Sequence, residues 1–207
     1  TVHMTIVFTG GGTGGHFYPI IAIAEAMNDL VHEERLIAPS LYYLAPNSFD
    51  EKALFENGIT YIHIPAGKVR HYASLRNITD SFITVVGTVS ALFTLFRLYP
   101  DVVMSKGGYG SVPTVLAARL LLIPIIIHES DAKPGRANLL AAKFADRIAI
   151  SFEGAAKYFP EKVQNKIART GIPIRKALMR MEPEGARQYL GLEKDVPTIL
   201  ILGGSQG

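Results

Sequence analysis

The chain has 207 residues, of which 48% are hydrophobic and 19% are charged, values typical of a folded protein rather than a disordered one. It contains no cysteine, which excludes disulfides and thiolate metal sites. The net charge is only +3, but residues 57–128 carry six lysines and arginines against two acids, Asp80 and Asp101. Such a stretch either attracts phosphate, nucleic acid or anionic lipid, or is ordinary solvated surface.

Short apolar runs alternate with helix-like segments along most of the chain. The runs cover residues 5–9, 41–45, 59–65, 101–105, 124–128 and 147–151. The first helix-like segment starts at Pro19 and runs towards Leu30. The others cover residues 48–57, 75–99, 112–122 and 136–145. Continuous apolar runs are typical of strands buried on both faces of a parallel sheet. The alternation predicts an α/β fold, a Rossmann-like doubly wound parallel sheet over residues 4–170.

Residues 75–99 are rich in Val, Thr and Phe, but their number favours a helix, because strands rarely exceed about ten residues. The uncharged apolar stretch inside this segment, residues 81–96, is shorter than the roughly 20 residues that span a bilayer. We therefore expect no transmembrane segment. The segment offers only a thin stripe of small residues, so we expect it to be covered by the core or by something outside the fold.

The pattern changes after residue 170. Residues 171–175 are typical of a turn-like crossing, 183–190 of a polar helix, and 193–195 of a charged break. Residues 198–202 then predict a buried strand that stops at the glycine turn 203–207. We interpret 171–196 as an inter-domain segment and 197–207 as the first strand and turn of a second, truncated α/β domain.

A glycine loop, residues 10–15, lies between the first predicted strand and its helix and ends at His16. Backbone N–H groups at such a helix start can bind phosphate oxygens. A dinucleotide site would also need an acid at the end of the second strand, and residues 44–47 contain none. His16 at the helix N-terminus is either a neutral ring able to accept a proton or a residue that merely caps the turn.

Two further polar clusters follow predicted strands. One is the glycine-rich segment 105–111, and the other is 128–131, followed by Pro134, Gly135 and Asn138. Open α/β sheets bind ligands at the carboxyl ends of their strands, where both clusters are expected. The chain has no Asp-x-Asp pair and no histidines at metal-ligand spacing, so we expect no metal.

Six motifs stand in one order along the chain. They are residues 11–16 with Pro19, 67–72, 106–109, 128–131 with Pro134 and Gly135, 171–175, and 203–207. In order and spacing they resemble the MurG family of glycosyltransferases over essentially the whole chain after Met4. The resemblance implies a GT-B architecture, two Rossmann-like domains facing a cleft, with no metal or other cofactor. It implies inverting transfer of N-acetylglucosamine from UDP-N-acetylglucosamine to lipid I, the undecaprenyl-diphosphate-linked muramyl-pentapeptide, giving lipid II.

The resemblance also implies roles for single residues. Those matching donor-binding positions are Thr13, Gly14, Gly15, Asp131, Arg175 and Ser205. Those assigned to acceptor binding are Lys68, Arg70, Tyr109 and Asn138. The catalytic base is either His16 or Glu129, and the residues do not choose between them. Asp131 stands where many members have Asn, and its carboxylate can accept but not donate a hydrogen bond.

Because most of the nucleotide pocket of this fold belongs to the second domain, we expect this chain to be the acceptor half and inactive alone. We expect the protein to bind peripherally to the cytoplasmic face of the plasma membrane, through apolar residues 82–96 and nearby basic side chains. Expected partners are an anionic membrane surface and other cell-wall synthesis proteins, with no nucleic acid. Two alternatives are a GT-B transferase for another acceptor and a non-enzymatic module that recruits a partner transferase chain to the membrane.

Overall fold

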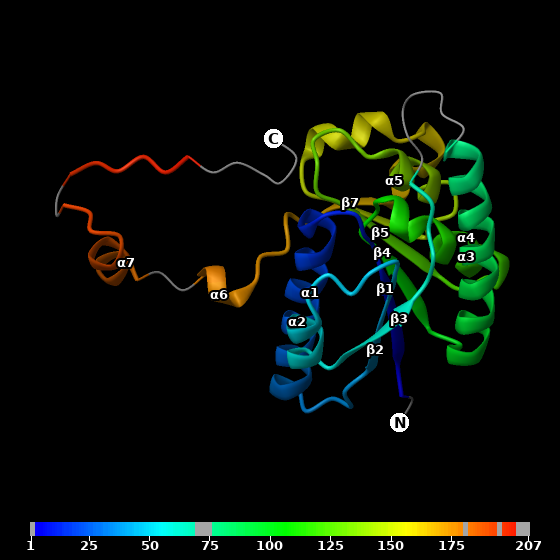
Figure 1. Cartoon of the computed structure of the whole chain (residues 1–207), viewed down its shortest axis with the longest axis horizontal. Helices are drawn as coiled ribbons and strands as arrows, with labels where there is room; N and C mark the ends of the chain where they lie inside the picture. Colours follow the sequence, from blue (N-terminus) through cyan, green and yellow to red (C-terminus); the bar gives the residue numbers. More distant parts are fainter. Residues whose placement is uncertain (1–2, 69–75, 180–181, 194–195, 202–207) are drawn as a thin grey trace.

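The computed structural model describes residues 3–68, 76–179, 182–193 and 196–201. Its centre is a seven-stranded parallel sheet of order β3-β2-β1-β4-β5-β6-β7 (Figure 1). The strands are β1 Thr5–Thr9, β2 Ser40–Ala45, β3 Ile59–His63, β4 Val102–Ser105, β5 Ile125–Glu129, β6 Arg147–Ile150 and β7 Ile167–Arg169. The predicted doubly wound α/β fold is confirmed.

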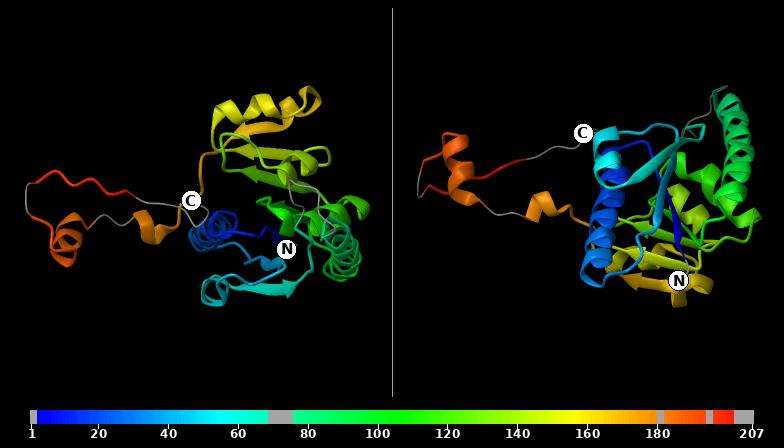
Figure 2. Two further views of the ribbon diagram at one scale, coloured as in Figure 1. Left: turned by 45° about the horizontal axis from the view of Figure 1, so that its top comes forward. Right: turned by 90° about the horizontal axis from the view of Figure 1, so that it is seen from below.

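Helices cover both faces of the sheet, as Figures 1 and 2 show. On one face α1 (Gly14–Glu33) and α2 (Glu51–Glu56) pack against alternate strand residues such as Phe8 and Tyr43. On the other, α3 (Arg76–Leu98), α4 (Val112–Leu120) and α5 (Arg136–Ala141) pack against residues such as Val103 and Ile127. Burial on both faces explains why the strands read as continuous apolar runs.

The order of the strands fixes where a ligand can bind. The chain proceeds from β1 outward to β2 and β3, then returns to place β4 on the other side of β1. At this reversal Thr9 of β1 pairs with Ser105 of β4, which pairs with Ile127 of β5. The segments that follow these three strands therefore start side by side, at the switch point where open sheets bind ligands.

The start of α1 differs from the prediction. The helix begins at Gly14, after Thr13 in extended conformation, and Pro19 lies inside it rather than at its start. Proline there removes the N–H that would bond the Gly15 carbonyl. The sequence signal was misleading because proline favours the first helical turn, whereas here the glycine loop itself turns into the helix.

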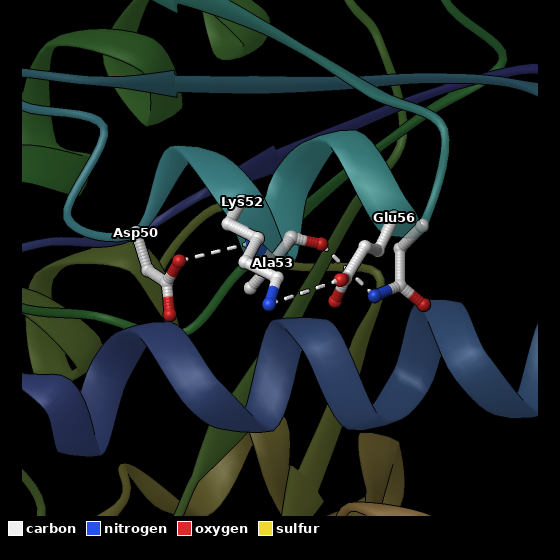
Figure 3. Close-up of polar contacts among 5 residues, drawn as sticks. Asp50, Lys52, Ala53 and Glu56 are labelled. Carbon is white, nitrogen blue, oxygen red and sulfur yellow. Dashed lines mark hydrogen bonds and ion pairs between the residues drawn. The ribbon is translucent and has the colours of Figure 1, made fainter.

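Helix α2 begins three residues later than predicted because Asp50 caps it. The Asp50 carboxylate accepts a hydrogen bond from the Ala53 backbone N–H at 2.9 Å, drawn in Figure 3. Lys52 and Glu56, one turn apart, lie 3.7 Å from each other with exposed side chains. An exposed pair of this kind adds only about 0.3–0.5 kcal/mol, so the cap contributes more to the position of this helix.

Some elements after β5 were not predicted or differ in length from the prediction. Strand β7 follows two 3-10 segments, Glu153–Tyr158 and Glu161–Lys166. It lies at the sheet edge, has only three residues and ends in Arg169, so it lacks the apolar run of a central strand. Helix α5 ends at Ala141, four residues earlier than predicted, in short turns that bury Ala142 and Ala145.

Helix α3 is much more exposed than a core helix. One side packs along α4 and buries Gly87, Ala91 and Leu95. The outer side exposes large apolar residues, namely Ile78, Phe82, Ile83, Val85, Val86, Val89, Phe93 and Phe96. The stretch Ile78–Leu98 is long and apolar enough to cross a membrane by length and composition, with 17% of its most apolar window buried. The sequence predicted no such segment because the uncharged run 81–96 alone is shorter than a bilayer requires. In the structure α3 packs along α4.

The predicted buried strand at residues 198–202 is wrong for the part that the structure describes. Residues 198–201 form no strand, and Ile199, Leu200 and Ile201 are exposed. An apolar run becomes a buried strand only where neighbours pair with it, and none of the described strands does so. The helix predicted at 183–190 is present as α7 (Pro183–Tyr189), after a short α6 (Lys176–Met179).

Gly87 allows α3 to approach the segment after β3. A Cβ at this position would collide with the Pro65 carbonyl oxygen and lie 3.2 Å from Cγ of Pro113. Gly87→Ala is therefore expected to lower the free energy of unfolding by about 1–3 kcal/mol, the usual cost of overpacking. Urea unfolding measures it. Gly154→Ala, where a Cβ meets nothing within 4 Å, is the control; an equal effect of both changes would contradict this explanation.

Candidate active site

The two glycine loops after β1 and β4 pack directly on each other. A Cβ on Gly108 would collide with the Gly11 carbonyl oxygen, and one on Gly12 would lie 3.0 Å from the Tyr109 ring. Gly108 also has a φ of +77°, a conformation that favours glycine. The glycines are therefore required for the close approach of the two backbones.

A cavity of about 780 Å³ opens between these loops and the segment after β5. Five predicted site residues line it: His16, Tyr109, Glu129, Asp131 and Asn138. Lys133 and Arg136 lie on its wall, and Gly67 and Thr84 of the α3 side complete it. The structure thus brings together residues from four distant parts of the chain.

Both oxygens of the Glu129 carboxylate accept hydrogen bonds from the segment that follows. Oε1 accepts from the Asp131 backbone N–H at 2.8 Å. Oε2 accepts from the Gly135 backbone N–H at 3.0 Å and from the Asn138 amide at 2.9 Å. Three of the roughly four lone-pair directions of this carboxylate are thus occupied. Glu129, 4% exposed, holds the 131–138 wall of the cavity.

The orientation of the Asn138 amide follows from its partners. Its Nδ2 lies 3.2 Å from the His128 carbonyl oxygen and 2.9 Å from Glu129 Oε2, and both can only accept. The amide nitrogen must therefore face them, which leaves Oδ1 buried without a hydrogen-bond partner within the described structure. A Cβ at Gly107 would lie 2.8 Å from this oxygen, so the glycine loop closes over Asn138.

His16 stands at the start of α1, half-buried at the cavity. Its Nδ1 lies 2.9 Å from Thr13 Oγ1, and its backbone N–H donates to the Thr13 carbonyl at 3.1 Å. Burial, and then the Lys106 charge, lower the pKa of His16 below 6.5, while Asp131 and Glu129 oppose them. The ring is therefore neutral near pH 7 and can accept a proton.

Comparison with known proteins identifies the family. The sequence model of one family, the glycosyltransferase family 28 N-terminal domain, matches residues 6–150. The chain belongs to this family.

Curated relatives of the family align over nearly the whole chain. The UDP-N-acetylglucosamine–N-acetylmuramyl-(pentapeptide) pyrophosphoryl-undecaprenol N-acetylglucosamine transferase of Treponema denticola is 37% identical over 98% of this chain and 52% of its own length. The transferase of the same name from Treponema pallidum is 40% identical over 98% of this chain and 51% of its own. The chain thus spans about half the length of these relatives.

Among solved structures, Acinetobacter baumannii MurG superposes with a TM-score of 0.64 at 26% identity, covering 84% of this chain and 47% of that one. A UDP-GlcNAc 2-epimerase of Neisseria meningitidis bound to UDP-GlcNAc, at 16% identity and TM-score 0.56, shares the fold. It covers 82% of this chain and 46% of its own. The resemblance to the MurG family is therefore confirmed.

The residues predicted to bind the sugar donor do not all lie together. Gly14, Gly15 and Arg175 line a separate apolar groove of about 350 Å³, away from the cavity that Asp131 lines. The Arg175 guanidinium lies 4.3 Å from the centre of the Tyr18 ring, a cation–π contact. Thr13 links the two places, since it precedes Gly14 and its hydroxyl contacts His16.

The predicted acceptor residues are also divided. Tyr109 and Asn138 line the cavity, whereas Lys68 is exposed and does not. Arg70 and Ser205 lie outside the described residues. Among the residues that the structure describes, no group of three or more acids and histidines is placed to hold a metal ion.

Lys106 was not among the predicted site residues, yet it lies buried beneath the cavity at 2% exposure. Its Nζ lies 2.7 Å from His128 Nδ1 and donates to Ser130 Oγ at 2.5 Å. Burial lowers the pKa of Lys106 to about 8, against the opposing charges of Glu129 and Asp131. A lysine inside a glycine loop was the available signal in the sequence. Only the order of the strands shows that this lysine meets His128 and Ser130 at the end of β5.

Proposed function

We propose that this chain supplies the acceptor-binding half of an inverting transferase that moves N-acetylglucosamine from UDP-N-acetylglucosamine to lipid I. The observation that carries the proposal is that His16, Tyr109 and Asp131 meet at one cavity, between the two glycine loops, in a chain of family 28. The names of the relatives support the substrates. Their greater length supports a second domain that carries most of the nucleotide pocket.

His16 is the proposed general base. The acceptor hydroxyl attacks the anomeric carbon, the bond to the UDP oxygen breaks with inversion, and His16 takes the hydroxyl proton. Its neutral ring and its place at the cavity suit this step. Glu129 is less suited because its oxygens are occupied by the 131–138 wall. We therefore assign Glu129 to holding that wall.

Positive charge for the leaving diphosphate is available without a metal. The N-terminus of the 20-residue helix α1 presents Gly14 and Gly15, and Arg175 lies at the same groove. A helix start and a guanidinium both favour phosphate oxygens. Asp131 can only accept a hydrogen bond, so it would meet a hydroxyl or amide N–H of a substrate rather than a phosphate.

An activity assay tests the proposal. A longer chain that includes the region present in the relatives should transfer N-acetylglucosamine to a lipid I analogue, and residues 1–207 alone should not. Addition of a separately expressed partner transferase chain to residues 1–207 tests the recruitment alternative. Transfer by the longer chain to another acceptor but not to the lipid I analogue would overturn the proposed acceptor.

The outer side of α3 is the proposed membrane-docking surface at the cytoplasmic face of the plasma membrane. A polyprenyl-linked acceptor stays in the bilayer, so the cavity must come to it. Phe82, Phe93 and Phe96 are each more than 60% exposed on this helix. The cations Lys68 and Arg97 are exposed as well, and each basic residue near an anionic surface adds on the order of 1 kcal/mol.

Changing Phe82, Phe93 and Phe96 together to serine is expected to lower the partition coefficient onto anionic vesicles at least about tenfold, because three apolar contacts are lost. Co-sedimentation with phosphatidylglycerol vesicles measures it, and binding should fall as salt rises. Phe55→Ser is the matched control, since Phe55 is 86% exposed on α2, across the sheet. Equal recovery of the triple variant and the parent would exclude α3 as the docking surface.

A further inference from the structure

A series of hydrogen bonds joins Lys106, His128 and Gly171. Lys106 Nζ lies 2.7 Å from His128 Nδ1, and His128 Nε2 lies 2.9 Å from the Gly171 carbonyl oxygen. Both side chains are 2% exposed. These hydrogen bonds therefore connect the end of β4, through the end of β5, with Gly171, the second residue after β7.

The partners fix the tautomer of His128. A carbonyl oxygen can only accept, so Nε2 carries the hydrogen and donates to Gly171. The lysine amine donates, so Nδ1 carries the lone pair and accepts from Lys106. A protonated ring would carry hydrogen on Nδ1 and face the ammonium group. Burial, and then the Lys106 charge, lower the pKa of His128, while the Gly171 carbonyl and the Glu129 carboxylate oppose them.

Gly171 is the point from which the crossing segment 172–175 starts. It has a φ of +80°, and its carbonyl also accepts from Ser151 Oγ at 3.1 Å. At the other end, the Lys176 backbone N–H donates to Glu25 at 2.9 Å, and the Lys176 ammonium pairs with Asp29 of α1. The segment is thus fixed at both ends, with Arg175 between them beside the Gly14–Gly15 groove.

We propose that Lys106 and His128 are positioning residues, which hold the Gly171 carbonyl and thereby place Arg175 at the start of α1. The role of Arg175 towards a diphosphate rests on the proposed function, whereas the hydrogen-bonded chain itself does not. An amine is suited to the Lys106 position because it donates to His128 and Ser130 together. The hydrogen bond to Nδ1 selects the ring tautomer whose Nε2–H donates to Gly171.

Nitrogen NMR of the histidine rings in residues 1–207 tests the chain of bonds directly. The parent should show His128 in the Nε2–H tautomer and still neutral below pH 6.5. Lys106→Met should raise the pH at which His128 protonates and mix its tautomers. Lys133→Met, which removes the same charge from the exposed wall of the cavity, is the control and should change neither. A parent ring with hydrogen on Nδ1 would overturn the proposal, whatever the variants do.

Kinetics of the longer, active chain tests the consequence for Arg175. Lys106→Met and Arg175→Met should each raise KM for UDP-N-acetylglucosamine several-fold, with a smaller change in kcat, and the double variant should be little worse than Arg175→Met alone. Independent, multiplying effects would overturn the link between Lys106 and Arg175. Activity of the longer protein on another acceptor would refute the proposed function. The hydrogen bonds from Lys106 through His128 to Gly171 would then still be tested by the NMR result.

Discussion

Replacing His16 with alanine is expected to lower the turnover of the longer, active chain by about 10²–10⁴-fold, the usual contribution of a general base. The reason is the neutral ring at the cavity, fixed through Thr13 Oγ1 at 2.9 Å. Affinity for the nucleotide sugar should change little, because the proton moves only in the chemical step. Steady-state kinetics with a lipid I analogue, with kcat and KM determined separately, provides the measurement.

The pH profile gives an independent reading of the same residue. A base must be unprotonated, and burial, followed by Lys106, lowers the pKa of His16. The acid limb of kcat/KM should therefore lie below pH 6.5 and disappear in His16→Ala. His32→Ala, near the far end of α1, is the control and should be silent. Turnover of His16→Ala within threefold of the parent would transfer the role of base to another group, with Glu129 the first to test.

The layout of the sheet could be predicted because buried parallel strands have an unambiguous pattern. In the run 124–128 every residue before His128 is apolar, and such runs stop at glycine or at polar residues. Their carboxyl ends must share one edge, so the convergence of His16, Tyr109 and Asp131 was expected, and the structure confirms that they line one cavity.

What the sequence could not predict depends on pairing between distant residues. Lys106 and His128 are 22 positions apart, and they meet only because β4 and β5 are neighbours. The three hydrogen bonds of Glu129 come from backbone and side-chain groups whose directions follow from the turn after β5. The apolar run 198–201 has the pattern of a buried strand, but pattern alone does not supply neighbours to pair with it.

The folded chain is expected to gain about 2–3 kcal/mol of stability from Lys106 alone as the pH rises from 7.5 to 10. Burial lowers the pKa of Lys106 in the folded state to about 8, against 10.5 for the free side chain. Below pH 8 both states hold the proton, and the buried charge costs the folded state its full penalty. Between pH 8 and 10.5 the folded state has released a proton that the unfolded state keeps, so stability rises with pH, by about 1.4 kcal/mol per unit.

Urea unfolding of parent and Lys106→Met at pH 7.5 and pH 10 isolates this contribution, because the other groups that titrate between these two pH values do so alike in both proteins. The two histidines that the Lys106 charge affects, His16 and His128, titrate below this range. Burial raises the pKa of Tyr43 in the folded state. Above about pH 10 the unfolded chain therefore loses the Tyr43 proton first, which lowers the stability of the folded state, so the measurement stays at or below this pH. The difference in unfolding free energy between parent and Lys106→Met should shift by 2–3 kcal/mol, roughly. Lys133→Met, which removes an exposed lysine, should follow the parent. The same pH dependence in parent and Lys106→Met would mean that the buried amine keeps its ordinary pKa, and that the charge beneath the cavity is compensated by Glu129 and Asp131.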